Sequence, residues 1–141
     1  MHAVAAATNV DAAHALIDPL DFTDRVAVGS AEQRIFAAWD GRDLALIVAG
    51  THQEIRAREL TAASANALLK INLNGPIATV ATVASALIAQ GGAVGIVSSY
   101  RALPKALVYG ASKAALINFA QVLYVDLHPK GSATTLSIPA S

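Results

Sequence analysis

Residues 108–115 read Val-Tyr-Gly-Ala-Ser-Lys-Ala-Ala, and this stretch decides how the rest of the chain is interpreted. On a helix, its spacing places the phenol of Tyr109 and the ammonium of Lys113 side by side on one face. A cation next to a phenol favours the phenolate, so such a pair can exchange protons near neutral pH. An ordinary surface helix has the same spacing. The small residues between the pair, and the strand-like run that ends at residues 97–99, favour a functional site.

Four further motifs occur along the chain in the order of the landmarks of a known superfamily. They are Asp21-Phe22-Thr23-Asp24, Ala49-Gly50, Asn72-Leu73-Asn74-Gly75, and residues 127–131 (Leu-His-Pro-Lys-Gly) followed by residues 137–139 (Ser-Ile-Pro). Together with the Tyr-x-x-x-Lys stretch, they resemble the D-x-T-D, N-N-A-G, N-x-x-G and sixth-strand landmarks of the short-chain dehydrogenase/reductase superfamily. The resemblance covers nearly all of the chain, and the set is highly specific although each motif alone is weak.

The resemblance implies catalytic roles for four residues. Tyr109 would give or take the proton of the substrate oxygen, and Lys113 would lower the pKa of that phenol and hold the nicotinamide ribose. Ser99 would hydrogen-bond the carbonyl oxygen, and Asn72 would support a chain of water molecules that leads to Lys113. The implied activity is oxidoreduction, a hydride transfer dependent on NAD or NADP between an alcohol and a ketone or aldehyde.

The same resemblance implies a cofactor cleft. Asp21 would contact the adenine side, and Ala49, Gly50 and Pro139 would line the cleft together with Tyr109 and Lys113. NAD and NADP both stay open, since the residues that read the ribose 2′ position normally follow a second strand that has no counterpart here. The identity of the substrate stays open as well, because the substrate loop of the family has no counterpart either.

Several positions depart from the family pattern. Ile47 and Val48 stand where the family has asparagines, Ala140 replaces the glycine of its Pro-Gly turn, and the connection from Ser99 to Tyr109 is shorter than usual. The family's glycine-rich turn, T-G-x-x-x-G-x-G, which holds the dinucleotide pyrophosphate at a helix N-terminus, is absent. We therefore expect residues 1–141 to form a single truncated Rossmann-like domain with impaired cofactor binding, and with weak or no activity as this chain alone.

Alternating helical and strand-like segments predict a parallel α/β fold. We expect helices over residues 3–13, 25–39 (with Asp24 as N-cap), 61–72, 76–90 and 109–127, a turn at 41–43, and strands over residues 14–20, 44–49, 93–98 and 133–138. The run at 44–49 is continuously apolar, as is typical of a buried strand. The expected architecture is a partial Rossmann-like fold of two or three layers with a four-stranded parallel sheet. Its three crossover helices would lie on one face, and the N-terminal helix or another chain would cover the other.

Composition and charge exclude several classes of protein. Ten basic and ten acidic residues cancel and are dispersed, so neither a nucleic-acid nor an anionic-membrane surface is expected. Without cysteine the chain has no disulfide or thiolate metal site, which fits a cytoplasmic protein. No charge occurs in residues 71–100, but interruptions at 74–76 and 90–92 are expected to prevent a membrane span. Surface or core-edge roles, without metal, are expected for His2, His14, His52 and His128.

Two functions of different class stay open. The first is an NAD(P)-dependent oxidoreductase acting on a small-molecule alcohol or carbonyl compound, represented by an incomplete chain or a miscalled start site. The second is a non-catalytic remnant that self-associates through helices 76–90 and 109–127, which build the dimer interface in the resembled family and would give a homodimer or homotetramer. Sequence upstream of Met1 would discriminate them, because an in-frame glycine-rich turn there supports the enzyme.

Overall fold

Three parallel strands form the sheet in this computed structural model, which describes residues 19–39, 43–99, 104–128 and 133–137. The strands are β1 (Leu44–Ile47), β2 (Ala93–Val97) and β3 (Ala133–Ser137), and they lie in chain order with β2 in the centre. Leu44 pairs with Ala93, and Ala93 pairs in turn with Ala133. All three strands therefore end at the same edge of the sheet, where parallel α/β folds place their ligands.

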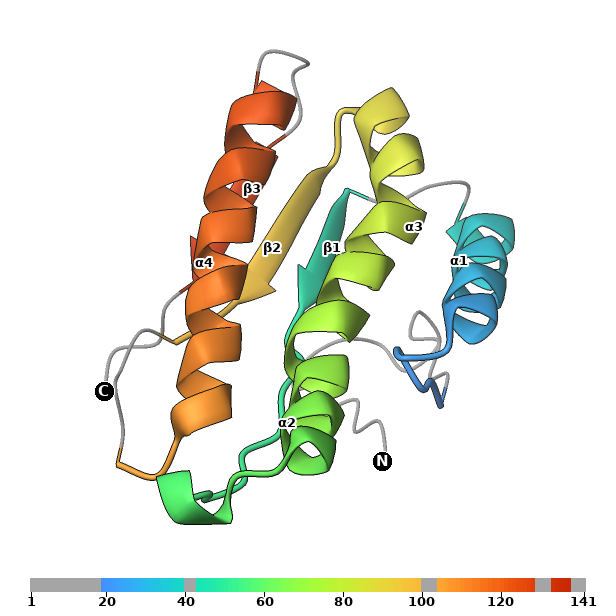
Figure 1. Cartoon of the computed structure of the whole chain (residues 1–141). Coiled ribbons are helices and arrows are strands. Elements are labelled where there is room, and N and C mark those ends of the chain that lie inside the picture. Colours follow the sequence, from blue (N-terminus) through green and yellow to red (C-terminus); the bar gives the residue numbers. More distant parts are fainter. Residues whose placement is uncertain (1–18, 40–42, 100–103, 129–132, 138–141) are drawn as a thin grey trace, which may run out of the picture.

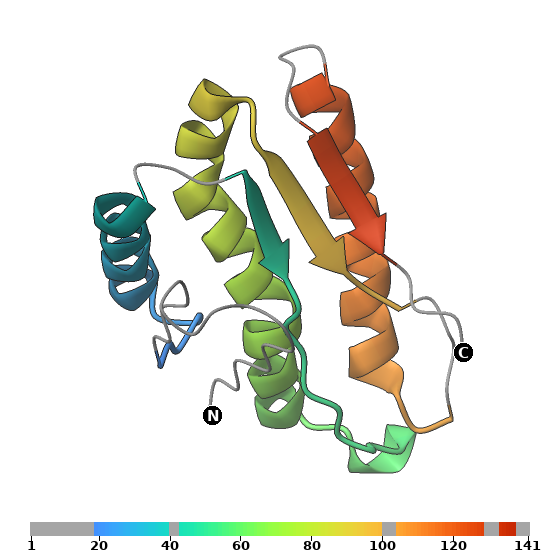
Figure 2. The same ribbon diagram turned by 180° about the vertical axis from the view of Figure 1, so that it is seen from behind.

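The helical segments connect these strands and cover one face of the sheet. In chain order they are α1 (Arg25–Trp39), the short turn η2 (Ala57–Glu59), α2 (Ala62–Leu69), the π-helical turn η3 (Lys70–Asn74), α3 (Gly75–Gln90) and α4 (Leu107–Leu127). Helices α3 and α4 lie side by side against the sheet, and α1 packs against α3 (Figure 1). Seen from behind, the sheet carries no described helix on its other face (Figure 2). The described residues thus form two layers.

The hydrophobic core lies between the sheet and the layer of α3 and α4. Its buried members from the two helices and the two adjacent strands are Val80, Val83, Leu87, Leu116, Ala120, Ile47, Val94 and Ile96. Full burial of a valine, leucine or isoleucine side chain contributes about 1.5–3 kcal/mol. This cluster therefore fixes α4, and with it the Tyr-x-x-x-Lys stretch, against the strands.

The other face of β1 is apolar and exposed to solvent. Leu44, Leu46 and Val48 are 55%, 58% and 69% exposed, and the side chain of Leu46 lies against Gly95. The prediction of a buried strand here is wrong for this face. Successive side chains of a strand point to opposite faces, and only the face that carries Ile47 meets the helices.

The expected four-stranded sheet also needs correction, because the sheet has three strands in the part of the chain that the structure describes. Residues 14–18 of the expected first strand lie outside the described residues, as do the expected helix at 3–13 and residues 41 and 42 of the expected turn. Pro19 and Leu20 are described and belong to no strand. A proline cannot donate to a strand ladder, since it has no backbone N–H.

The remaining predicted elements are confirmed, with small shifts at their ends. Helix α1 begins after Asp24, whose carboxylate accepts hydrogen bonds from the N–H groups of Val26 at 2.9 Å and Ala27 at 3.2 Å. This is the predicted N-cap. Helix α2 has its own cap at Thr61, whose hydroxyl accepts from the N–H of Ser64 at 3.1 Å.

The predicted interruption at residues 74–76 is wrong, because α2, η3 and α3 run on as one helix of 29 residues, Ala62–Gln90. The π-helical turn accommodates Pro76, which has no N–H to donate: the N–H of Gly75 bonds to the carbonyl of Lys70, one residue further back than in an α-helix. By length and mean hydropathy, which reaches 1.4, this helix could cross a membrane, and a third of that window, 33%, is buried inside the fold.

Gly75→Ala is expected to destabilise the fold by about 1–3 kcal/mol, because a Cβ at this position would overlap the ring of Phe22. The matched control is Gly29→Ala in α1, where a Cβ would have no neighbour within 4 Å. This control should stabilise the chain by up to about 1 kcal/mol through helix propensity. Urea unfolding measures both changes. A parental urea midpoint for Gly75→Ala would contradict the close contact with Phe22.

Candidate active site

Tyr109 and Lys113 lie on successive turns of α4 and open into the same pocket, so the predicted pairing of the two side chains is confirmed. The pocket has a volume of about 240 Å³ and lies where β1 and β2 end. Its other lining residues come from the segment after β1 and from the end of β2: Val48, Ala49, Gly50, Thr51, His52 and Val97. A phenol and an ammonium thus face residues from both strand ends.

The side chain of Lys113 is buried and held by backbone carbonyls. The residue is 5% exposed, and its ammonium donates to the carbonyl of Ala49 at 2.8 Å and, at 3.5 Å, to that of Val97. Burial lowers the pKa of this ammonium, because desolvation disfavours its charged form. Lys113 Nζ lies 5.9 Å from the centre of the Tyr109 ring. A cation is thereby fixed next to the phenol.

Gly50 is the point where Lys113 and Asn72 come together. A Cβ on Gly50 would lie 3.0 Å from Lys113 Nζ and 3.7 Å from Asn72 Oδ1. A side chain at this position would therefore push the ammonium by a few tenths of an ångström. The glycine of the Ala49-Gly50 motif lets the backbone approach Lys113 without this shift.

Asn72 is fully buried in the π-helical turn and orders the segment that follows β1. Its amide oxygen accepts from the N–H of Thr51 at 2.7 Å, and its amide nitrogen donates to the Thr51 carbonyl at 2.8 Å. Both backbone groups of Thr51 are thus satisfied by one side chain. The structure gives Asn72 a definite contact that the sequence did not indicate.

The two serines after β2 differ in their surroundings. The Ser98 hydroxyl is buried and donates to the backbone carbonyl of Lys113 at 2.8 Å, which ties the end of β2 to α4. Ser99 is half-buried and does not line the pocket of Tyr109 and Lys113. The described contacts therefore do not bring Ser99 together with Tyr109 in this structure. Pro139, the remaining predicted cofactor residue, lies outside the described residues.

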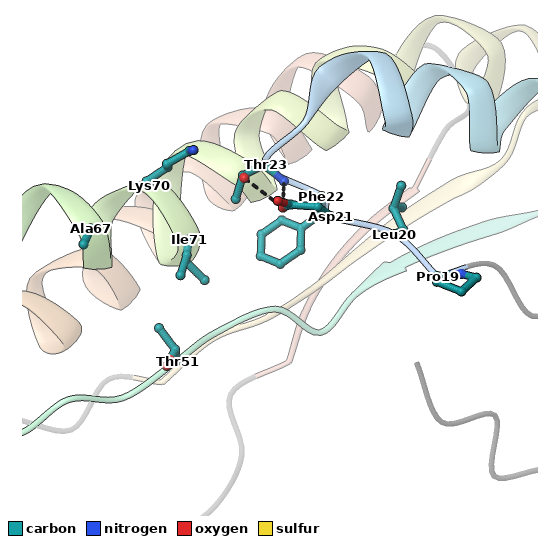
Figure 3. Close-up of a pocket in the computed structure, with 9 residues that line it drawn as sticks. All are labelled: Pro19, Leu20, Asp21, Phe22, Thr23, Thr51, Ala67, Lys70 and Ile71. Atoms are coloured by element: carbon teal, nitrogen blue, oxygen red, sulfur yellow. Dashed lines mark hydrogen bonds between the residues drawn. The ribbon is translucent and has the colours of Figure 1, made fainter. Parts of the chain in front are cut away.

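A second pocket, of about 670 Å³, adjoins the first (Figure 3). It is lined by Pro19, Leu20, Asp21, Phe22, Thr23, Thr51, Ala67, Lys70 and Ile71, and Thr51 belongs to both pockets. The Thr23 hydroxyl and N–H donate to Asp21 at 2.8 and 2.9 Å and lower the pKa of its carboxyl. The two pockets thus share one lining residue, Thr51, in the segment after β1.

His52 is a site residue that sequence reasoning missed. Its ring meets the Tyr109 ring edge-on, with 5.1 Å between the ring centres and an angle of 90° between the planes. Its only signal in the sequence is its position two residues after Gly50, in the segment that follows a strand. Without metal spacing around it, the sequence predicts a surface or core-edge role for His52. Among the described residues no cluster of possible metal ligands occurs.

Asn72→Ala is expected to cost about 2–4 kcal/mol of folding free energy, because it leaves the N–H and carbonyl of Thr51 without their partner. Asn74→Ala is the matched control, since Asn74 is exposed and its side chain makes no capping bond to α3. Urea unfolding of both variants gives the comparison. Equal losses in the two variants would show that the amide of Asn72 does not hold Thr51.

Lys113→Met is expected to flatten the alkaline pH dependence of stability. A lowered folded-state pKa means that the unfolded chain, with the ordinary value of 10.5, binds the proton more tightly. The contribution of Lys113 to the unfolding free energy therefore increases as pH rises between those two pKa values. Lys105→Met is the control that should keep the parental slope in this range, because Glu54 raises the pKa of Lys105 and the contribution of Lys105 therefore changes only near and above 10.5. Unfolding free energies measured from pH 7 to 10.5 test this prediction. Identical slopes of the unfolding free energy against pH in Lys113→Met and in the parent would contradict it.

Residues 1–140 match the short chain dehydrogenase family. The fold resembles apo LigO from Sphingobium sp. strain SYK-6 (26% identity, TM-score 0.83, 92% of this chain and 51% of that chain). It also resembles a metagenomic short-chain oxidoreductase in complex with NADP (22% identity, TM-score 0.80, 88% of this chain and 58% of that chain). A third similar structure is a 3-ketoacyl-ACP reductase from Sinorhizobium meliloti 1021 (22% identity, TM-score 0.81, 86% of this chain and 51% of that chain).

The likeness to these three structures covers most of this chain and only part of theirs. The chain spans about half the length of each. None of the curated proteins matches it. The motifs of the sequence, the pocket of Tyr109 and Lys113, and the family match over residues 1–140 agree with one another. The chain belongs to the short-chain dehydrogenase family.

Proposed function

We propose that this chain carries the nicotinamide side of an NAD(P)-dependent oxidoreductase, which transfers a hydride between an alcohol and a ketone or aldehyde. The supporting observation is the pocket that Tyr109 and Lys113 share at the ends of β1 and β2. Open parallel sheets bind their ligands outside the carboxyl ends of the strands. The substrate class is a small-molecule alcohol or carbonyl compound.

Tyr109 is the proton donor and acceptor in this proposal. In the reducing direction its hydroxyl gives a proton to the substrate oxygen, and in the oxidising direction the phenolate takes the proton back. The ammonium of Lys113 lies 5.9 Å from the ring centre and lines the same pocket. Proton transfer of this kind typically accelerates a reaction about 10²–10⁴-fold.

The residues of the two pockets fit parts of a dinucleotide cofactor. An ammonium has three N–H groups, and the Ala49 and Val97 carbonyls take two of those of Lys113, which leaves one for a ribose hydroxyl. Gly50 keeps the backbone close to that group. The larger pocket, with Asp21 at its turn, has a volume typical of small-molecule sites and would take the adenine side. NAD or NADP would supply the hydride donor or acceptor.

Two of the similar structures support this cofactor and substrate class. One is described in complex with NADP, and another is a 3-ketoacyl-ACP reductase. This sequence has no glycine-rich turn for the pyrophosphate. Each charge-assisted hydrogen bond from such a turn is worth about 1.5–3 kcal/mol. We therefore expect the single domain of residues 1–141 to bind the dinucleotide weakly and to be a poor catalyst as this chain alone.

Exposed apolar side chains on α4 favour self-association as a second function. Val122, Tyr124 and Val125 are 55%, 46% and 67% exposed near the end of the helix. Large apolar patches on a surface favour protein contacts. Helices 76–90 and 109–127 would then join copies of the chain into a homodimer or homotetramer, with or without catalysis.

The proposed oxidoreductase function is tested by calorimetric titration with NADH and NADPH, followed by assay of hydride transfer to small ketones. We expect saturable binding of one dinucleotide, with a dissociation constant of about 1 mM given the missing phosphate contacts. Lys113→Ala should abolish binding. Tyr109→Phe should bind normally and lose at least about 100-fold in turnover.

The control is Lys70→Ala, which removes an exposed ammonium from the rim of the larger pocket and leaves the phenol and Lys113 in place. Its turnover at saturating dinucleotide should be close to that of the parent. A folded chain that binds neither dinucleotide would contradict the oxidoreductase proposal. If that chain sediments as a dimer or tetramer, self-association is the function that it supports.

A further inference from the structure

The ring of Tyr109 depends on residues outside its own helix for its orientation. Tyr109 is the third residue of α4, and helical side chains lean toward the N-terminus over the preceding turn. In the first turn of a helix no such turn exists. Ala106, which precedes α4, has only a methyl group and makes no side-chain capping bond. The helix therefore offers the Tyr109 ring fewer neighbours than it offers a side chain further along.

The ring of His52 is the aromatic neighbour of the Tyr109 ring. The two rings meet edge to face at 5.1 Å and 90°, and both line the pocket of Lys113. This arrangement is the favourable one for aromatic pairs, because the positive edge of one ring meets the negative face of the other. The ammonium of Lys113 lies 5.9 Å from the same ring centre. The phenol ring thus has an imidazole and a cation as close neighbours.

His52 is itself held by contacts on both sides, within a segment that we call the strap (residues 51–55). At its start, Asn72 bonds both backbone groups of Thr51. At its end, the N–H of Ile55 donates to the Lys105 carbonyl at 2.8 Å, and Ile55 forms a parallel bridge with Ala106. Ile55 and Ala106 are both buried. The strap is therefore fixed to the residues that immediately precede α4.

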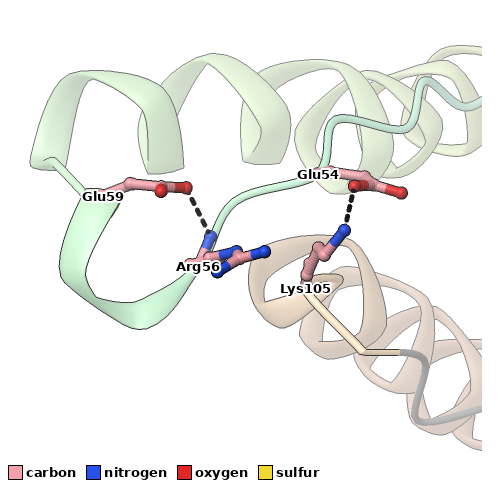
Figure 4. Close-up of polar contacts among 4 residues, drawn as sticks. All are labelled: Glu54, Arg56, Glu59 and Lys105. Carbon is pink, nitrogen blue, oxygen red and sulfur yellow. Dashed lines mark hydrogen bonds and ion pairs between the residues drawn. The ribbon is translucent and has the colours of Figure 1, made fainter.

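An ion pair adds to the contacts between the strap and the residues that precede α4. Glu54 and Lys105 form an ion pair of 2.8 Å, and beyond the strap Glu59 accepts from the backbone N–H of Arg56 at 3.2 Å (Figure 4). Lys105 adopts a positive φ of 63°, a conformation that costs energy for a residue other than glycine. Such backbone strain persists where the surroundings determine the conformation, and it concentrates at functional sites.

We propose that His52 is a positioning residue for Tyr109: its imidazole holds the phenol ring at the wall of the pocket, and the strap holds His52. The strap compensates for the first-turn position of the tyrosine, where its own helix has no preceding turn for the ring to cover. The consequence for proton transfer rests on the proposed oxidoreductase function, whereas the orientation of the ring is independent of that function.

The contact is tested by NMR of the chain with carbon-13-labelled tyrosine rings, using His52→Ala and His52→Phe. The Tyr109 signal is assigned by its loss in Tyr109→Phe. In His52→Ala it should move toward the position of a solvent-exposed tyrosine, and in His52→Phe, which keeps an aromatic ring, it should stay displaced. Tyr124 is the internal reference, because its ring lies 5.1 Å from His128. Its signal should move in His128→Ala and not in His52→Ala.

The effect on chemistry is tested by NADPH-dependent reduction of a small ketone. We expect kcat to fall about two- to tenfold in His52→Ala, the range that an edge-to-face pair corresponds to. The KM for NADPH should stay unchanged, and His52→Phe should restore kcat to within about twofold of the parent. A general loss of structure would change KM and kcat together and would not be rescued by phenylalanine.

The outcomes separate this proposal from the proposed function. An unmoved Tyr109 signal in His52→Ala overturns the positioning role, whether or not the chain is active. A parental kcat in an active His52→Ala variant overturns it as well. A moved signal in a chain that binds neither dinucleotide supports the positioning of the ring and contradicts the oxidoreductase proposal instead.

Discussion

The buried ammonium of Lys113 is the constraint around which the site is arranged. A charge taken out of water must be hydrogen-bonded, and the carbonyl of Ala49 at 2.8 Å meets this requirement. The backbone carbonyl of the same lysine accepts from the Ser98 hydroxyl. One residue of α4 is therefore bound to the segments after both β1 and β2. A Cβ on Gly50 would lie 3.0 Å from this ammonium, so the glycine lets the backbone pass close to it.

A second buried polar contact fixes the segment that follows β1. The buried amide of Asn72 holds Thr51, which belongs to both pockets. The π-helical turn that contains Asn72 also lets one helix run past Pro76 without a break. A local irregularity of the helix and the shape of the site are thus linked. π-helical turns are frequent at functional sites.

The two faces of the sheet are covered unequally. The helix side of the sheet is packed, whereas Leu44, Leu46 and Val48 are exposed on the other side of β1. The apolar residues at the end of α4 are exposed on the helix layer. Both surfaces are of the kind that buries itself against further protein. The chain spans about half the length of the similar structures, and its site lies at the strand edge, where Val48 belongs both to the exposed side of β1 and to the lining of the pocket.

The sequence by itself determined the pairing of Tyr109 with Lys113, the cap at Asp24 and the order of the described elements. These depend on helical periodicity and on bonds between near neighbours along the chain. Only the tertiary structure decided which face of β1 is covered, since an apolar run looks the same on both faces. It also decided that Asn72 bonds Thr51 and that His52 meets Tyr109. Such contacts join distant segments, and local periodicity carries no information about which segment will lie opposite another.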